Sequence, residues 1–189
     1  MGMFEYVAVL TSIILGLGIA HLLQGAAHLI QHPKEARTYW IHLVWAFYVF
    51  YEAVFWWWWE FRLERVEEWT FPMYLFLVFY AVLVYLLCAI LFPSSLSGYR
   101  DYKEYFFSRR AWFFGIFIVI QLVDVGDTLL KGNAYFVSLG PGYVVQRVVR
   151  ILLFGVAIAT PNVPFHALLA IGLLLYQLWF GFHRYYTVG

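Results

Sequence analysis

Two pairs of ionisable residues stand inside apolar sequence in the second half of the chain. Asp124 and Asp127 are three residues apart, and so are Arg147 and Arg150. Residues three apart lie on one face of an α-helix, so each pair would present two like charges to the same neighbour. Carboxylates and guanidinium groups within apolar helices pair with one another, bind ions or carry protons. These four side chains are the strongest candidates for chemistry.

The spacing also predicts how these charges pair. If the two segments are antiparallel helices, both aspartates can reach Arg147, while Arg150 lies one turn deeper and meets Glu52 of an earlier apolar segment. Three acids against two arginines leave one acid over, which could hold a proton, bind a cation or contact a histidine. The predicted buried polar network consists of Glu52, Asp124, Asp127, Arg147, Arg150 and His21.

The composition requires a membrane environment for these helices. Hydrophobic residues make up 64% of the 189 residues and charged residues 12%, whereas soluble proteins average about 45–50% and about 25%. Aromatic residues reach 23%, which is typical of side chains placed at the lipid headgroups. The formal net charge of +1 gives no reason to expect a nucleic-acid partner.

The fold class follows from the length of the apolar segments. A crossing needs ~20 residues, and proline or glycine interrupts the sequence between such segments. We predict a single all-α domain over 1–189, a polytopic integral membrane protein with a bundle of about six transmembrane helices and short links. The predicted spans are 4–30, 39–61, 72–92, 111–130, 143–160 and 165–185.

Local patterns add detail to this bundle. Gly16 and Gly18 form a small-residue face that lets another helix approach closely. The run Trp56–Trp59 covers all sides of a helix turn and is interpreted as an interfacial anchor. Residues 22–27 align weakly with residues 129–134. This similarity suggests a 3+3 inverted repeat, as found in transporters. Surface helices are predicted over 60–68 and in the link before residue 110.

The distribution of basic residues predicts the orientation. An even number of crossings puts both termini on one side, and the first and third links carry more Lys and Arg than the opposite side. The six basic residues of those links are Lys34, Arg37, Arg100, Lys103, Arg109 and Arg110; the opposite four are Arg62, Arg65, Lys131 and Arg184. We therefore expect the termini outside, in a bacterial inner membrane.

Histidine spacing raises a second chemistry. His28 and His32 are four residues apart, and His42 follows across the first link at a similar depth. Such residues can ligate zinc, and two histidines at equal depth can hold a b-type haem. A hydrogen-bonding or interfacial role is the simpler interpretation, so we predict no cofactor and keep haem or metal as an alternative.

Known catalytic patterns are missing. The sequence has no phosphate-binding loop or dinucleotide fingerprint, and its Ser94 to Ser97 cluster lies in a link. We therefore expect a protein that is not an enzyme. The leading hypothesis is a small transporter or channel-like protein for an ion, proton or small anion. The alternatives are a structural or regulatory membrane subunit and a haem or metal redox protein. The expected partners are the lipid bilayer and either a second copy of the chain or another membrane protein.

Overall fold

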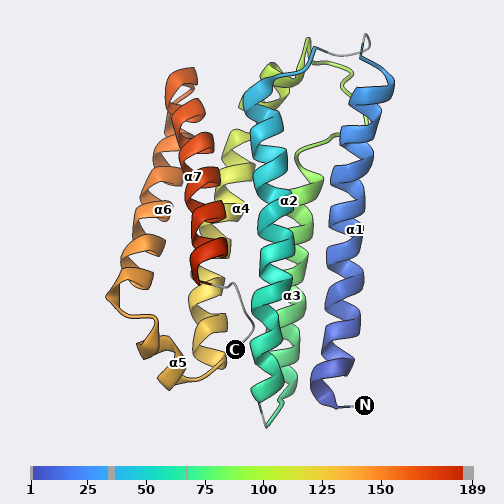
Figure 1. The fold of residues 1–189 in the computed structure, drawn as a ribbon. Helices are drawn as coiled ribbons and strands as arrows, with labels where there is room; N and C mark the ends of the chain where they lie inside the picture. Colours follow the sequence, from blue (N-terminus) through green and yellow to red (C-terminus); the bar gives the residue numbers. More distant parts are fainter. Residues whose placement is uncertain (1, 34–36, 67, 185–189) are drawn as a thin grey trace.

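The computed structural model describes residues 2–33, 37–66 and 68–184. Within this part of the chain every regular element is a helix, and long helices run up and down a bundle (Figure 1). Lys34, counted for the orientation, and Tyr185, the end of the last predicted span, lie outside the described residues. The elements are α1 Met3–Gln31, α2 Trp40–Glu60, the short 3-10 helix η1 Phe61–Arg65, α3 Phe71–Ala89, α4 Tyr102–Leu130, α5 Asn133–Ser138, α6 Pro141–Ala159 and α7 Val163–Arg184.

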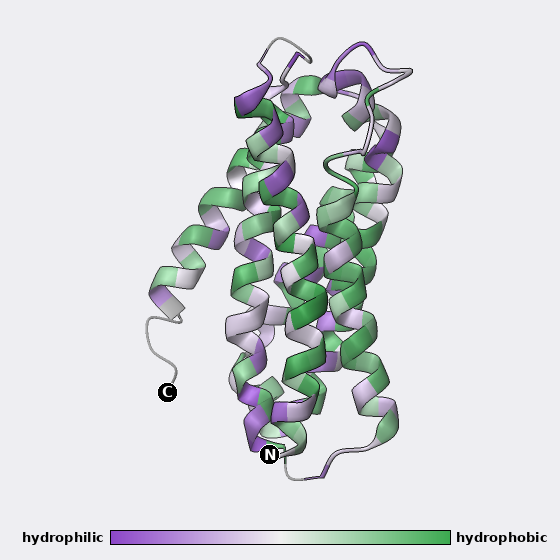
Figure 2. Cartoon of the chain, turned by 90° about the vertical axis from the view of Figure 1, so that its right-hand side faces the viewer, coloured by the Kyte–Doolittle hydropathy of each residue, from purple (hydrophilic) through white to green (hydrophobic). Residues whose placement is uncertain are grey.

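Five helices are long and apolar enough to cross a membrane, namely α1, α3, α4, α6 and α7. Hydrophilic residues concentrate at the two ends of the bundle, and hydrophobic residues dominate between them (Figure 2). Helix α2 has 21 residues but is rich in Trp and Tyr and carries Glu52, which lowers its hydropathy. It packs against α7, α1 and α3 and contributes many of the buried core residues.

Close packing of α1 on α3 depends on glycine. A Cβ at Gly18 would come within 3.3 Å of the Tyr85 backbone, and a Cβ at Gly25 would overlap the ring of Phe92. Gly16 has open space around it, so only part of the predicted small-residue face is used. The main partner of α1 is α3, whereas the main partner of α4 is α6. The two halves therefore do not pack alike, and the structure does not follow the suggested 3+3 repeat.

The links differ from the predicted ones. Helix α4 begins nine residues before the predicted span, because Asp101 caps it by accepting a hydrogen bond from the Glu104 N–H (2.8 Å) and Tyr105 is buried against the core. Of the link in which an interfacial helix was predicted, residues 93–101 form turns and bends, whereas residues 102–110 are helical and belong to α4 itself. In the described part of 60–68, where a short surface helix was predicted, the structure has the short 3-10 helix η1, and the link between α4 and α6 contains α5.

Candidate functional site

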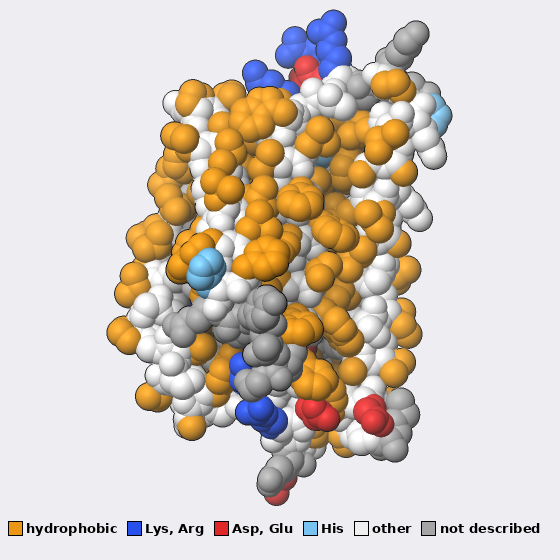
Figure 3. Space-filling view, in the orientation of Figure 1, with side chains coloured by type: hydrophobic (Ala, Val, Ile, Leu, Met, Phe, Trp, Pro, Cys, Tyr) orange, Lys and Arg blue, Asp and Glu red, His pale blue; other side chains and the backbone are white. Residues whose placement is uncertain are grey.

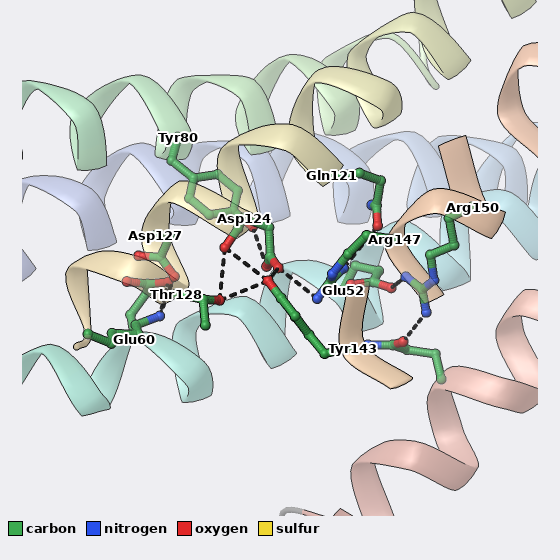
Figure 4. Close-up of polar contacts among 12 residues, drawn as sticks. Glu52, Glu60, Tyr80, Gln121, Asp124, Asp127, Thr128, Tyr143, Arg147 and Arg150 are labelled. Carbon is green, nitrogen blue, oxygen red and sulfur yellow. Dashed lines mark hydrogen bonds and ion pairs between the residues drawn. The ribbon is translucent and has the colours of Figure 1, made fainter. Parts of the chain in front are cut away.

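A buried carboxylate, Asp124 on α4, is the centre of the polar interior. Arg147 on α6 pairs with it at 2.7 Å, as the spacing predicts. Tyr80 on α3 donates a hydrogen bond to the same carboxylate (3.1 Å), and Tyr143 donates another (2.5 Å). Three donors from two other helices thus surround one acid, which Figure 4 shows. Arg147 also donates to the side-chain oxygen of Gln121 (2.9 Å).

Arg150 lies one turn further along α6 and is 3% exposed. Its guanidinium group is 3.4 Å from Glu52 of α2, the predicted partner. It also donates to the Tyr48 hydroxyl (3.2 Å) and to Gln177 of α7 (2.7 Å). Because a charge in an apolar interior has lost its water, such contacts compensate for the cost of burying the guanidinium group. We refer to Glu52, Gln121, Asp124, Arg147 and Arg150 as the central cluster.

The central cluster faces a small cavity of about 50 Å³. One water needs about 10–15 Å³ by this measure, so the cavity can hold a few water molecules or a small ion. A second cavity of about 240 Å³ adjoins it and shares Gln146 and Arg147 as lining residues. That cavity extends to Leu139, which follows α5, and to Gly142 in the first turn of α6. The central cluster is therefore approached from the end of the bundle where α5 lies.

Two of the four consecutive tryptophans also line the central cavity. Trp56 and Trp59 are 6% and 5% exposed and lie among its walls, whereas Trp57 and Trp58 are 40% and 44% exposed. The prediction of an interfacial anchor thus holds for two residues at most. Helix α2 lies inside the bundle, so one side of its last turns faces protein rather than lipid or headgroups.

An aromatic core fills the other half of the bundle. Trp45 packs against Phe113 and Phe114 with ring centroids 5.3 Å apart in each case, and Phe117 stacks on Phe154 at 4.9 Å. These side chains are at most 2% exposed. Phe113 precedes Asp124 by eleven residues on α4, or about 16 Å of helix. The buried carboxylates and guanidinium groups of the central cluster therefore stop short of this aromatic core, against which the buried side chains His42 and His166 pack.

A second group of charges lies nearer the α5 end, where Lys131 bridges two carboxylates. Its ammonium is 3.1 Å from Glu60 of α2 and also pairs with Asp127. Burial lowers the pKa of Lys131, but the carboxylates of Glu60 and Asp127 more than reverse that effect and the pKa lies above its ordinary value. We call Glu60, Asp127 and Lys131 the end cluster; Figure 4 shows Glu60 and Asp127 beside the central cluster.

The end cluster corrects one predicted pairing. Asp127 was predicted to meet Arg147, but it pairs with Lys131, four residues later on the same side of the helix end. Arg147 is held by Asp124 one turn deeper. Sequence reasoning missed Glu60 and Lys131 as members of the polar interior because both stand at the ends of apolar segments. The i, i+4 spacing of Asp127 and Lys131 is the signal that could have found this pair.

His21 does not belong to the polar network predicted for it. Its Nε2 lies 2.7 Å from the backbone oxygen of Phe92, after α3. The physical reason is the packing of α1, whose main partner is α3, whereas the charges project from α2, α4 and α6. The prediction for His21 was wrong because the periodicity of one helix shows which side chains share a face but not which helix packs against that face.

The three histidines considered as metal ligands are not gathered around one point. His28 and His32 are neighbours with ring centroids 4.6 Å apart. His42 is fully buried, bonds the Leu91 backbone oxygen at 2.7 Å and stacks on Tyr102. Within the described ranges, no three His, Cys, Asp or Glu side chains are placed to hold a metal ion. The haem or metal alternative therefore gains no support from these residues.

Comparison of the chain with protein-family models, with curated proteins and with solved structures found no match.

Proposed function

We propose that this protein is a small multi-pass membrane transporter or channel-like protein that carries protons through a half-pathway. The observation that supports it is the one-sided arrangement of the buried charges. The end cluster and the central cluster follow one another along the bundle (Figure 4), and the aromatic core occupies the half beyond them. Ion pairs that only hold helices together do not need to be concentrated in one half of the bundle. A proton half-pathway that ends at a closed aromatic layer requires this one-sided arrangement.

The proton is the ion that best fits the charge balance and the space. The two clusters contain four carboxylates and three basic groups, so the fully ionised interior carries one excess negative charge. Binding of a single proton neutralises that charge and requires no additional space in the cavity. The cavity of about 50 Å³ can supply a few waters for proton transfer but not a site for an organic substrate.

We further propose six crossings, with α2 as the least apolar one. Helix α2 packs mainly against α7 and also contacts α1 and α3, and it carries Glu52, whose carboxylate lies 3.4 Å from the Arg150 guanidinium group. Of the basic residues counted for the orientation, Arg37, Arg100, Lys103, Arg109 and Arg110 belong to the end away from α5, whereas Arg62 and Arg65 lie on η1 at the α5 end; Figure 3 shows Lys and Arg side chains at both ends. By the preference of basic links for the cytoplasm, the polar half-pathway would open on the outer side, with the N-terminus.

The test is proton flux into liposomes. Purified protein is reconstituted with a trapped pH-sensitive dye, and a potassium diffusion potential drives protons inward. The wild type should acidify the lumen, and Asp124→Asn should reduce the rate at least tenfold, because an amide cannot exchange the proton. Glu64→Gln is the matched control, since Glu64 is exposed on η1, and it should retain the wild-type rate.

The flux experiment also distinguishes proton transport from the main alternative, a structural or regulatory subunit. The close pairing of the buried charges favours that reading, because ion pairs of this kind can fix the register of helices without any transport. Wild-type vesicles that leak no faster than empty ones would support the subunit and end the proposal of proton transport.

A further inference from the structure

The end cluster holds two acids against a single base, deep in the protein. Glu60 is 5% exposed and Asp127 is fully buried, and Lys131 reaches one oxygen of each. Among the described residues, Glu60 Oε2 and Asp127 Oδ1 have no hydrogen-bond partner. Two buried carboxylates and one ammonium leave one negative charge and two unpaired acceptors. Burying such a charge without a counter-ion is costly, whereas binding a proton removes it.

Among the described residues, Lys131 is the base that pairs with Glu60 and Asp127, whereas Arg62, two residues after Glu60, lies over the ring of Tyr135. The next basic group along the bundle, Arg147 of α6, is engaged by Asp124, which adds another negative charge on the α4 side. From α3, Tyr80 donates to Asp124, and Tyr143 of α6 does the same. On the side of α1, η1 and α3, Glu60 borders a cavity of about 250 Å³ and is the one ionisable residue among the described residues that line it. The proton can therefore be exchanged through that cavity.

We infer that Glu60 and Asp127 together form a proton-binding site that holds one proton at neutral pH. The bound proton sits on a carboxylate oxygen of one of the two acids, while Lys131 remains an ammonium and neutralises the other. One part of this inference rests on the proposed function: the role of the site as the outer proton acceptor of the pathway. Occupancy by the proton is a property of the folded protein itself.

Infrared spectroscopy of the protein in detergent micelles tests the site directly. The wild type should show a protonated-carboxyl band at neutral pH that disappears as the pH rises. Glu60→Gln and Asp127→Asn should each lose this band, because one acid then faces one ammonium and both are ionised. Glu64→Gln, an exposed control, should keep it. Loss of the band only in Asp124→Asn would assign the proton elsewhere and overturn the inference, as would a wild type without the band.

Stability provides a second readout that needs no transport. If the folded state holds one proton that the unfolded chain has released, the unfolding equilibrium constant should increase by up to tenfold per unit of rising pH above neutrality. Glu60→Gln should abolish this slope, and Asp127→Asn supplies the same test if Glu60→Gln does not fold. An unchanged slope in both variants would contradict the site. Flux absent from a wild type that keeps the band and the slope would reject the transport proposal alone.

Discussion

Arg147 is the residue on which the central cluster depends for its charge balance. It pairs with Asp124 at 2.7 Å and donates to Gln121, and both contacts lie within the bundle. Removing one partner of a buried pair leaves the other charge uncompensated, which costs about 3–5 kcal/mol, whereas removing both charges costs much less. The arrangement therefore predicts strong energetic coupling between positions 124 and 147.

We expect Arg147→Gln to lower the free energy of unfolding by about 3–5 kcal/mol. The double variant with Asp124→Asn should recover most of that loss, because two amides can hydrogen-bond to each other and to Gln121. Titration with a denaturing detergent, followed by tryptophan fluorescence, measures both. A double variant as unstable as Arg147→Gln alone would show that the pair is not coupled.

At the scale of the helices, the close packing of α1 depends on glycines, which have no side chain. A Cβ at Gly25 would overlap the Phe92 ring, whose residue is 3% exposed and whose backbone oxygen contacts His21. The ring has little room to move, so an added methyl group has to be accommodated by separating the helices. Gly16, on the same helix, has no neighbour within 4 Å of its Cβ position.

Gly25→Ala should therefore destabilise the protein by about 1–3 kcal/mol, the usual cost of overpacking. Gly16→Ala is the matched control and should be neutral or slightly stabilising, since alanine has the higher helix propensity. Thermal unfolding in detergent compares the two variants. Equal stability of both would mean that α1 and α3 are not in close contact at Gly25.

At the scale of the whole molecule, the two ends of the bundle differ in chemistry. The half away from α5 contains the aromatic core, whereas a cavity at the α5 end leads to the buried charges, and Lys and Arg side chains are exposed at both ends (Figure 3). This polarity would give the proposed half-pathway a direction only if the protein inserts in one orientation. Basic links favour the cytoplasmic side, so the polar opening should face outward.

Labelling of engineered cysteines tests this orientation. The natural Cys88 is fully buried and provides an unlabelled background. In intact bacterial cells, a membrane-impermeant maleimide should label Glu64→Cys, beside the polar opening, at least fivefold more than Ser94→Cys in the basic link. Both sites are exposed, so permeabilised cells should label them equally. The reverse preference in intact cells would place the opening in the cytoplasm.

The amino-acid sequence by itself determined the helices and two of the charge pairs. Apolar segments of crossing length, separated by proline and glycine, specify helices through local composition. The pairs of Asp124 with Arg147 and of Glu52 with Arg150 followed from depth along antiparallel helices, which depends only on helical rise.

Tertiary structure decided the rest, because neighbours across a bundle are chosen by side-chain shape. Phe92 against Gly25 draws α1 to α3 and removes His21 from the charges. The position of α2 inside the bundle brings Glu60 to Lys131, a contact between residues 71 apart in sequence. The aromatic core likewise exists only where rings of α2, α4 and α6 meet. Helical periodicity gives a face and a depth, but only packing determines what lies opposite.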